Sequence, residues 1–291
     1  MAEGDSMGAA LRVAAEGEHP LQVLGAINAY AAIMAERLGA RALYLSGAGV
    51  ANASFGLPDL GLTTLEEVGE EARRIAAVTS LPLLVDADTG WEDPAATVRA
   101  LFAAGAAGCH FEDQVSAKRC GHRPNKALVS TEEMVGRLGA ALEGRSDPSF
   151  VVMARTDAAA TEGLSGAIER AKAYVEAGAD MIFAEALGDL DEFRVFSEAI
   201  SVPVLANMTE FGATLVQPAK DFAAAGIALV LYPLSAFRAM NRAAESTYRA
   251  ILSEGSQKSM IPSMQTRKEL YDYLDYLRAE AEQDRRRSEA E

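Results

Sequence analysis

The 291-residue sequence has few of the residues that build disulfide frameworks or zinc sites. It contains two cysteines, Cys109 and Cys120, and three histidines. Two cysteines are no disulfide framework for a chain of this size, and such usage is typical of a reduced cytoplasmic protein. A zinc site needs about four Cys or His ligands, and the few present are scattered along the chain. We therefore expect neither zinc nor disulfide bonds.

Long apolar runs and an excess of basic residues are also missing. No stretch of about 18 uncharged apolar residues occurs, so no membrane span is expected. The amino-terminal residues lack the basic start and apolar run of a signal peptide. Asp and Glu number 42 against 27 Lys and Arg, a formal net charge of −15. Because such a surface repels nucleic acid and anionic membranes, we expect neither as a partner. An anionic substrate would need a local cationic pocket.

Apolar residues are abundant, at 49% of the chain, and they are grouped in short runs. Eight of these runs are interpreted as buried parallel strands: Leu21–Gly25, Ala42–Leu45, Leu83–Ala87, Gly108–Phe111, Phe150–Ala154, Met181–Ala184, Val204–Ala206 and Ala228–Leu231. Stretches with helical spacing lie between most of them, among them Leu65–Val78, Pro94–Ala104, Thr131–Leu142, Gly166–Ala177, Leu190–Ala199 and Leu234–Leu252. Eight strands alternating with helices predict an α/β fold of the (β/α)8 TIM barrel type rather than a doubly wound sheet.

Two regions lie outside this alternation. The first twenty residues predict an extra helix before the first strand. The residues after about 254 have Tyr and Leu spacing typical of a docking helix, followed by a charged tail. No internal linker is recognisable. We therefore expect a single barrel domain over residues 1–291, with a C-terminal helical extension from about residue 254.

In such a barrel the active site lies at the carboxyl ends of the strands, and unusual polar residues follow the expected strands here. The third strand ends in VDADTGW, which contains Asp86 and Asp88. Two residues apart on an extended segment, they point the same way and repel unless a cation lies between them. Oxygen ligands suit Mg²⁺ or Mn²⁺. The alternative is a pair of solvated turn aspartates, which the preceding apolar run disfavours.

Carboxylates and a small-residue turn follow the neighbouring strands. Glu112 and Asp113 lie at the same level of the barrel, and Glu112 could ligate the metal or hold its waters. His110 lies earlier in that strand and could equally be a core histidine. After the second strand, Ser46 is followed by small residues that let backbone amides approach a carboxylate closely. Alone, that turn also fits an ordinary βα connection.

The segment KRCGHRPNK places Cys120 among four side chains that are basic or can become so, at Lys118, Arg119, His122 and Arg123. Such a field favours the thiolate and proton exchange. A redox thiol and half of a zinc site are the competing interpretations. Cys109 lies inside an expected strand and is interpreted as a buried apolar filler.

Polar residues follow the remaining strands as well: Arg155 and Asp157, Glu185, Asn207 and Thr209, with Arg238 in the last barrel helix. The Lys and Arg members would supply the cationic pocket, since Arg suits bidentate carboxylate binding. The residues thus predict a metal site beside an activated thiol in a carboxylate-binding pocket. That combination suits chemistry through an enolate or aci-carboxylate.

The motifs YLSGAGVA, VDADTGWED, HFEDQ, KRCGHRPNK, ARTDA, FAEA and NMTEFG, in this order and on these strands, resemble the isocitrate lyase and phosphoenolpyruvate mutase superfamily. The resemblance runs from about Leu21 to Arg267. The KRCGHRPNK segment is highly specific, whereas the barrel is not. Within the superfamily the motifs most resemble the branch that cleaves 2-methylisocitrate to pyruvate and succinate, in the methylcitrate route of propionate breakdown.

The resemblance implies a role for each matching residue. Asp86 and Asp88 would hold Mg²⁺, with Glu112 in support, and Cys120 would protonate the succinate aci-anion. Tyr44 is a candidate for the base at the alcohol. Substrate binding would involve Ser46, Gly47, Ala48, Asp59, Cys120, Gly121, Arg155, Glu185, Asn207, Thr209, Arg238 and Arg267, and Lys118 and His122 would give polar support to catalysis. The resemblance also implies a homotetramer whose subunits exchange a C-terminal helix.

One departure and two alternatives accompany this interpretation. The superfamily commonly has SGGG where this chain has Ala48 as the third residue; its methyl group is expected to tighten the loop without abolishing activity. A sister reaction is the first alternative: isocitrate or dimethylmalate cleavage, oxaloacetate hydrolysis or decarboxylation, or carboxyphosphonoenolpyruvate mutase chemistry. The second is a non-catalytic redox-sensing or metabolite-binding barrel built around Cys120, which would not need the paired aspartates.

Overall fold

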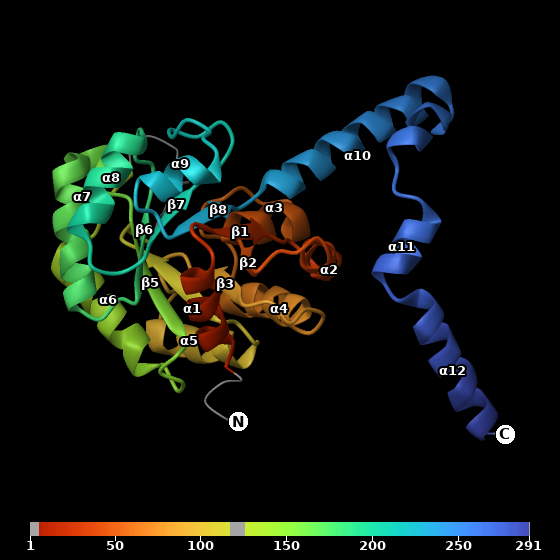
Figure 1. Cartoon of the computed structure of the whole chain (residues 1–291), viewed down its shortest axis with the longest axis horizontal. Coiled ribbons are helices and arrows are strands. Elements are labelled where there is room, and N and C mark those ends of the chain that lie inside the picture. Colours follow the sequence, from red (N-terminus) through yellow and green to blue (C-terminus); the bar gives the residue numbers. More distant parts are fainter. Residues whose placement is uncertain (1–5, 117–125, 291) are drawn as a thin grey trace. The chain divides into compact units, whose positions relative to one another are not determined.

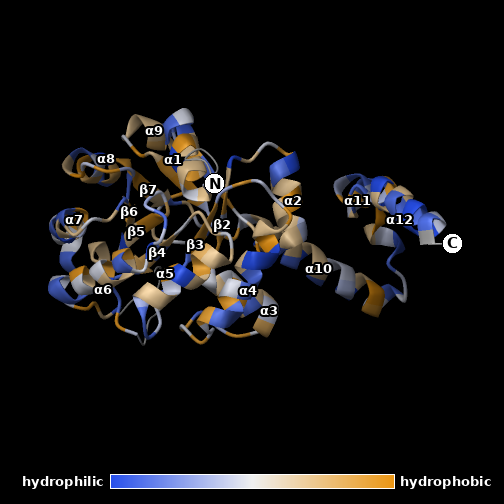
Figure 2. Ribbon diagram, turned by 90° about the horizontal axis from the view of Figure 1, so that it is seen from below, coloured by the Kyte–Doolittle hydropathy of each residue, from blue (hydrophilic) through white to orange (hydrophobic). Residues whose placement is uncertain are grey.

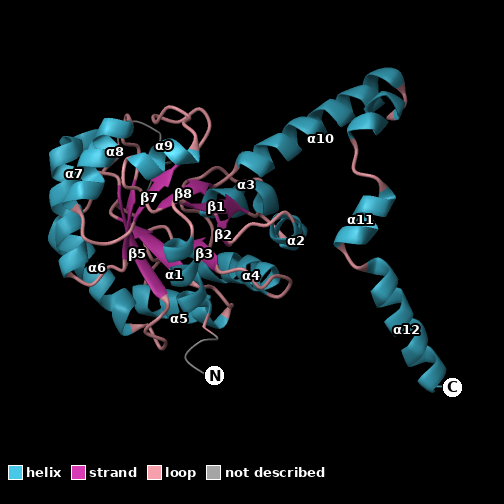
Figure 3. Cartoon of the chain, viewed as in Figure 1, coloured by secondary structure: helices cyan, strands magenta, loops and turns pink. Residues whose placement is uncertain are grey.

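Eight parallel strands pair in chain order, and the last pairs with the first, so the sheet closes into a barrel surrounded by helices (Figures 1 and 3). The structure is a computed structural model and describes residues 6–116 and 126–290. The strands are β1 (Leu21–Gly25), β2 (Ala42–Leu45), β3 (Leu83–Asp86), β4 (Gly108–Glu112), β5 (Val151–Thr156), β6 (Met181–Ala184), β7 (Val204–Asn207) and β8 (Leu229–Tyr232). The predicted TIM barrel is confirmed.

Helices connect the strands and cover the outside of the barrel (Figure 1). They are α2 (Ala29–Arg37), α3 (Gly47–Phe55), α4 (Leu65–Ala76), α5 (Pro94–Ala103), α6 (Thr131–Glu143), α7 (Ala159–Glu176), α8 (Leu190–Ala199) and α9 (Ala219–Ala224). Several begin at a side-chain cap, which satisfies amide groups of the first turn. Thr64 and Glu67 form a capping box on α4, and Asp93 caps α5 ahead of Pro94. These caps fix where each strand-to-helix loop ends.

The predicted amino-terminal helix is present as α1 (Met7–Gly17), and it covers the amino-terminal end of the barrel. Leu11, Ala14 and Ala15 of α1 pack in one cluster with barrel residues such as Leu21 and Leu229. The Arg12 Nε group donates a hydrogen bond of 3.0 Å to the Ser149 carbonyl, just before β5. The polar residues discussed below lie at the opposite end of the barrel, where the strands have their carboxyl ends.

Residues 236–291 form a second compact unit, described as far as residue 290. It contains α10 (Ser235–Glu254) without the first residue of that helix, Ser235. It also contains the 3-10 helix η1 (Lys258–Ser263), α11 (Arg267–Tyr273) and α12 (Tyr276–Ala290). Figure 2 shows that α12 is largely hydrophilic. Ala250 is the only buried residue among those of the unit whose burial is described. None of the described helices has the length and apolar character needed to cross a bilayer.

Candidate active site

The two-residue alternation of the strands points a ring of polar side chains into the barrel. Along each strand, one set of side chains packs in the barrel interior and the other packs against the helices. In β2 and β3, Ala42 and Leu84 belong to the interior cluster, whereas Leu43 and Val85 belong to the helix-facing one. Continuing each interior set by two residues gives a polar layer at the carboxyl ends of the strands: Tyr44, Asp86, His110, Glu112, Arg155, Glu185 and Asn207. All are buried.

Asp86 and Asp88 lie close together, although not by the route that the sequence predicts. Asp86 ends β3, and Asp88 has a φ of 48°, so the chain is left-handed there rather than extended. The Asp88 amide donates a hydrogen bond of 3.1 Å to Asp86 Oδ1. The expectation of an extended Asp86–Asp88 segment was therefore wrong, because the chain leaves the strand immediately after Asp86. A tight turn brings the second carboxylate back beside the first.

Gly47 marks the space beside both carboxylates. A Cβ atom at this position would lie 3.2 Å from Asp86 Oδ2 and 3.5 Å from Asp88 Oδ1. The Gly47 amide donates a hydrogen bond of 3.0 Å to Asp86 Oδ2. Ser46, the N-cap of α3, accepts a hydrogen bond of 3.2 Å from the Gly49 amide. The predicted carboxylate-binding turn thus forms the first turn of α3, and in this structure its Gly47 amide is directed at Asp86.

Arg155 is bound by three carboxylates inside the barrel. Its Nε atom lies 2.9 Å from Asp157 Oδ2, its Nη2 atom 3.2 Å from Glu185 Oε2, and its Nη1 atom 3.5 Å from Glu112 Oε2. Burial lowers the pKa of Arg155, but the carboxylates, Asp157 first, outweigh it and hold the pKa well above its ordinary value. The charge of Arg155 is therefore balanced within the site, so Arg155 does not by itself make the barrel mouth cationic as the sequence predicts.

Negative charge predominates in the described part of the site. The buried carboxylates include those of Asp86, Asp88, Glu112, Asp157 and Glu185, and the buried cations that contact members of this group include Arg155 and Lys126. Carboxylates gathered away from water repel unless cations neutralise them. Carboxylate oxygens are also the ligands that Mg²⁺ and Mn²⁺ prefer. The donor set and the space at Gly47 therefore fit a hard divalent cation.

Asp86 and Asp88 form a pair rather than a complete ligand set. No group of three or more His, Cys, Asp and Glu side chains is arranged to hold a metal in residues 6–116 and 126–290. Glu112 instead lies beside Arg155, and its amide donates a hydrogen bond of 2.8 Å to the Asp88 carbonyl. A magnesium ion keeps several waters and takes few protein ligands, so two carboxylates are sufficient to anchor one.

Tyr44 and His110 share a hydrogen bond of 2.8 Å between the Tyr44 hydroxyl and His110 Nε2. The same nitrogen lies 3.6 Å from Asp86 Oδ1, and the two rings are stacked with their centroids 5.8 Å apart. Burial first, and then the charge of Asp86, raise the pKa of Tyr44 well above its ordinary value. Tyr44 is therefore a neutral phenol here, and a role as base would require a nearby cation to stabilise its phenolate.

The other predicted site residues fall into four groups. Glu185 follows β6, and the Asn207 side-chain amide donates a hydrogen bond of 3.3 Å to its Oε2 atom. Thr209 is buried after β7, and Asp59 is partly buried after α3. Arg238 and Arg267 belong to the second unit, on α10 and at the start of α11. Four predicted residues, Lys118, Cys120, Gly121 and His122, lie outside the described residues.

Lys126 and Asp113 are two buried residues to which the sequence assigned no role. Lys126 Nζ lies 2.8 Å from Asp157 Oδ1. Asp113 accepts hydrogen bonds from the Thr156 hydroxyl at 2.8 Å and from the Tyr174 hydroxyl at 2.9 Å. Residues 113–115 also pair in an antiparallel manner with residues 127–129 through backbone hydrogen bonds. The only sequence signal for Lys126 was its place at the end of KRCGHRPNK.

Comparison with known proteins places the chain in a family and identifies proteins that are similar to it. Residues 11–252 match the family described as phosphoenolpyruvate phosphomutase. The chain is 57% identical to 2-methylisocitrate lyase of Escherichia coli over 283 residues, which cover 96% of each chain. A crystal structure of 2,3-dimethylmalate lyase is 31% identical, with a TM-score of 0.88 over 96% of this chain and 95% of that one. A phosphonopyruvate hydrolase, solved with oxalate and Mg²⁺, is 29% identical, with a TM-score of 0.82 over 95% and 97%.

Proposed function

Since the chain belongs to the phosphoenolpyruvate phosphomutase family, we propose that it is a carbon–carbon lyase that cleaves 2-methylisocitrate to pyruvate and succinate, as part of propionate breakdown. The observation that carries this proposal is the 57% identity to 2-methylisocitrate lyase of Escherichia coli, over 96% of both chains. The 2,3-dimethylmalate lyase shares the fold at 31% identity. Of these two substrates, the tricarboxylate is therefore the one that the sequence favours.

We propose Mg²⁺ as the metal, with Mn²⁺ as a substitute, held by Asp86 and Asp88 and supported by Glu112. Support comes from the buried carboxylate pair, the space left at Gly47, and the phosphonopyruvate hydrolase solved with oxalate and Mg²⁺. When bound, the cation would supply stabilisation of the oxyanion at the hydroxy-acid end of the substrate. The attraction between the cation and that oxyanion would be strong, because the carboxylates proposed to hold the cation are buried.

The proposed reaction moves one proton at each end of the bond that breaks. The hydroxyl group on C2 loses its proton, C2 becomes the carbonyl carbon of pyruvate, and the C2–C3 electron pair stays on the succinate fragment. Tyr44, held by His110, is the candidate base at the hydroxyl. Cys120 is the candidate acid that protonates the succinate carbanion, with Lys118 and His122 in support. The proton count therefore balances without an added oxidant or reductant.

Substrate binding is proposed to involve both the barrel and residues outside it. The barrel candidates lie around the polar layer described above: Ser46, Gly47, Ala48, Asp59, Arg155, Glu185, Asn207 and Thr209. Cys120, Gly121, Arg238 and Arg267 complete the proposed set. Because Arg155 is balanced by carboxylates, the cationic residues of KRCGHRPNK and of the second unit are the proposed source of attraction for a tricarboxylate.

We further propose that the chain works as a cytoplasmic homotetramer in which subunits exchange C-terminal helices. Large apolar side chains of the second unit are exposed in the single chain, including Leu252 at 86%, Leu277 at 73% and Ile261 at 58%. Apolar surface of this kind favours a protein partner, here a second copy. Light scattering of the purified protein would measure the mass, and four times the 30.8 kDa chain mass is expected.

The activity is tested by a substrate screen with purified protein and Mg²⁺. We expect the rate of pyruvate release from 2-methylisocitrate to exceed the turnover of isocitrate, 2,3-dimethylmalate, oxaloacetate and carboxyphosphonoenolpyruvate. One methyl group in a pocket is worth about 1–3 kcal/mol, so the preference over isocitrate should be about tenfold to 200-fold. Faster turnover of any competitor would overturn the substrate assignment. No turnover of any of them would overturn the proposed lyase activity.

A further inference from the structure

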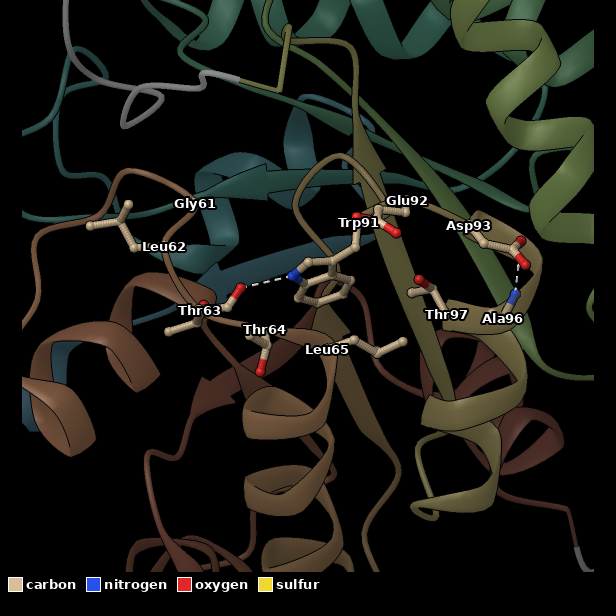
Figure 4. Close-up of a pocket in the computed structure, with 10 residues that line it drawn as sticks. All are labelled: Gly61, Leu62, Thr63, Thr64, Leu65, Trp91, Glu92, Asp93, Ala96 and Thr97. Atoms are coloured by element: carbon tan, nitrogen blue, oxygen red, sulfur yellow. Dashed lines mark hydrogen bonds between the residues drawn. The ribbon is translucent and has the colours of Figure 1, made fainter.

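Trp91 is the single tryptophan of the chain, and its side chain forms part of a pocket beside the Asp88 turn. The pocket has a volume of about 540 Å³ and lies between the loop before α4 and the start of α5 (Figure 4). Figure 4 shows the indole pointing at Thr63, and its Nε1 group donates a hydrogen bond of 2.8 Å to the Thr63 carbonyl. Trp91 thus ties the chain three residues beyond Asp88 to a separate loop.

The turn that carries Asp88 has an unusual backbone. Asp88, Gly90 and Trp91 have φ angles of 48°, 93° and 50°, so two residues with side chains are left-handed within four positions. This conformation is disfavoured for residues other than glycine and persists only where the surroundings impose it. Contacts from outside the turn are therefore needed to keep Asp88 beside Asp86.

Three neighbouring elements supply those contacts. From α5, the hydroxyl of the fully buried Thr97 donates a hydrogen bond of 2.9 Å to the Gly90 carbonyl. From β4, the ring of Phe111 lies under Gly90, where a Cβ atom would be 3.0 Å from Phe111 Cε1. The loop before α4 accepts the Trp91 hydrogen bond. Neither Thr97 nor Trp91 has a carboxylate or a charge of its own to offer a cation.

We propose that Thr97 and Trp91 are positioning residues for the divalent-cation site, acting by holding the 88–91 turn in its left-handed form. The inference rests on the proposed metal role of Asp86 and Asp88, and it is independent of which substrate the enzyme takes. Residues that orient metal ligands from behind typically change metal affinity by about 10–100-fold when they are replaced. Thr97 and Trp91 should therefore affect cation binding before any substrate is present.

The first test is Thr97→Val, which keeps the side-chain shape and removes the hydroxyl group. Binding of Mn²⁺ to the full-length protein without substrate is measured by calorimetry and by the electron paramagnetic resonance of free Mn²⁺. We expect the dissociation constant of Thr97→Val to rise by about 10-fold or more. Thr97→Ser keeps the hydroxyl and should bind within about threefold of wild type. Equal affinity of Thr97→Val and wild type would overturn the role of Thr97.

A matched control separates this effect from the general loss of a buried hydroxyl. The hydroxyl of Thr214 donates to the Leu187 carbonyl from a buried position, as Thr97 does to Gly90, but it joins the β6 and β7 loops. Thr214→Val should leave Mn²⁺ affinity unchanged. If it weakens Mn²⁺ binding as much as Thr97→Val does, the effect is not specific to the 88–91 turn and the proposal fails.

Trp91→Phe provides a second variant, because Trp91 is only partly buried and the substitution keeps an aromatic ring while the N–H donor is lost. It should also weaken Mn²⁺ binding, and it decides the proposal if Thr97→Val does not fold by circular dichroism. Unchanged affinity in Trp91→Phe would then overturn the proposal. A failed substrate screen with weakened Mn²⁺ binding in these variants would refute only the lyase assignment. A wild type that binds no Mn²⁺ would refute the metal site itself.

Discussion

The Lys126 ammonium lies 2.8 Å from Asp157 Oδ1, and the same carboxylate accepts two hydrogen bonds from the Arg155 guanidinium. All three side chains are buried. Asp157 thus joins Lys126 to the arginine at the centre of the polar layer. A buried carboxylate between two cations is a contact in which the loss of one partner is costly.

Lys126→Met should destabilise the protein, because it removes one of the two cations that balance buried Asp157. Breaking a buried ion pair costs about 3–5 kcal/mol, and the remaining Arg155 contact favours the lower end of that range. Urea denaturation would measure the free energy of unfolding. Lys172→Met is the control, since Lys172 pairs with Glu169 on the surface and should change stability little. Equal effects of the two substitutions would contradict the assignment of a buried pair.

Tyr174→Phe should change how stability depends on pH. Burial first, and then the charge of Asp113, raise the pKa of Tyr174, whose hydroxyl donates to Asp113 Oδ2. The unfolded chain therefore ionises Tyr174 from about pH 10, whereas the folded chain keeps the proton, and wild-type stability falls as pH rises. The variant should lose about 1.5–3 kcal/mol at pH 7 from the missing hydrogen bond.

That deficit should shrink by about 1.4 kcal/mol per pH unit above pH 10, because Tyr174→Phe has no proton to lose. Urea denaturation between pH 7 and pH 11 measures both values. Tyr248→Phe is a suitable control, since Tyr248 is 66% exposed and should leave the profile unchanged. A constant difference between Tyr174→Phe and wild type across this range would show that the Tyr174 pKa is not raised.

Removal of the divalent cation should abolish turnover, and Asp88→Asn should do the same irreversibly. We expect activity to fall by more than about 100-fold in EDTA and to return with excess Mg²⁺ in wild type but not in Asp88→Asn. Asp93→Asn is the matched control on the same loop, because asparagine also caps a helix well. Full activity of wild type in EDTA would exclude the metal role of Asp86 and Asp88.

The two cysteines should differ in both reactivity and importance. Cys109 is fully buried, and burial raises the pKa of its thiol, so it should stay protonated and unreactive. Iodoacetamide should label only Cys120 in the native protein, as read by peptide mass spectrometry. Cys120→Ser should lose nearly all pyruvate release, whereas Cys109→Ala should retain it. Labelling of Cys109 in the folded protein would contradict the interpretation of that residue as core.

The strands of the barrel could be predicted from their apolar runs, and the observed bounds of β1, β2 and β6 match the prediction, but the ends of the other five could not be placed from that signal. Strands β4 and β7 extend through Glu112 and Asn207, and β5 through Thr156, because these polar side chains are buried. In these three strands, a criterion based on apolar character ends the strand before its last polar residues. The expected helix from Gly166 is α7 from Ala159, with a non-helical Gly163 between two helical stretches.

The sequence predicted that several candidate residues would lie together at one end of the barrel, but not which of them would contact one another. Strand order and alternation were sufficient to gather Asp86, Glu112 and Arg155 at one end of the barrel. They could not show that Arg155 would be balanced by three carboxylates, because two of those pairs, with Glu112 and Glu185, join it to neighbouring strands and depend on side-chain length. The left-handed turn at Asp88 was also missed, since aspartate carries no local signal strong enough to predict it.

Gly47 can be replaced less freely during evolution than the next residue, Ala48. Even alanine at position 47 would put a methyl group 3.2 Å from Asp86 Oδ2 and 3.5 Å from Asp88 Oδ1, in the space proposed for a cation. Ala48 already carries such a methyl group one residue later, on the same helical turn. We expect mutational drift to be tolerated at position 48, where it can adjust substrate preference. We expect glycine to be required at position 47 in every related enzyme that keeps the proposed cation site.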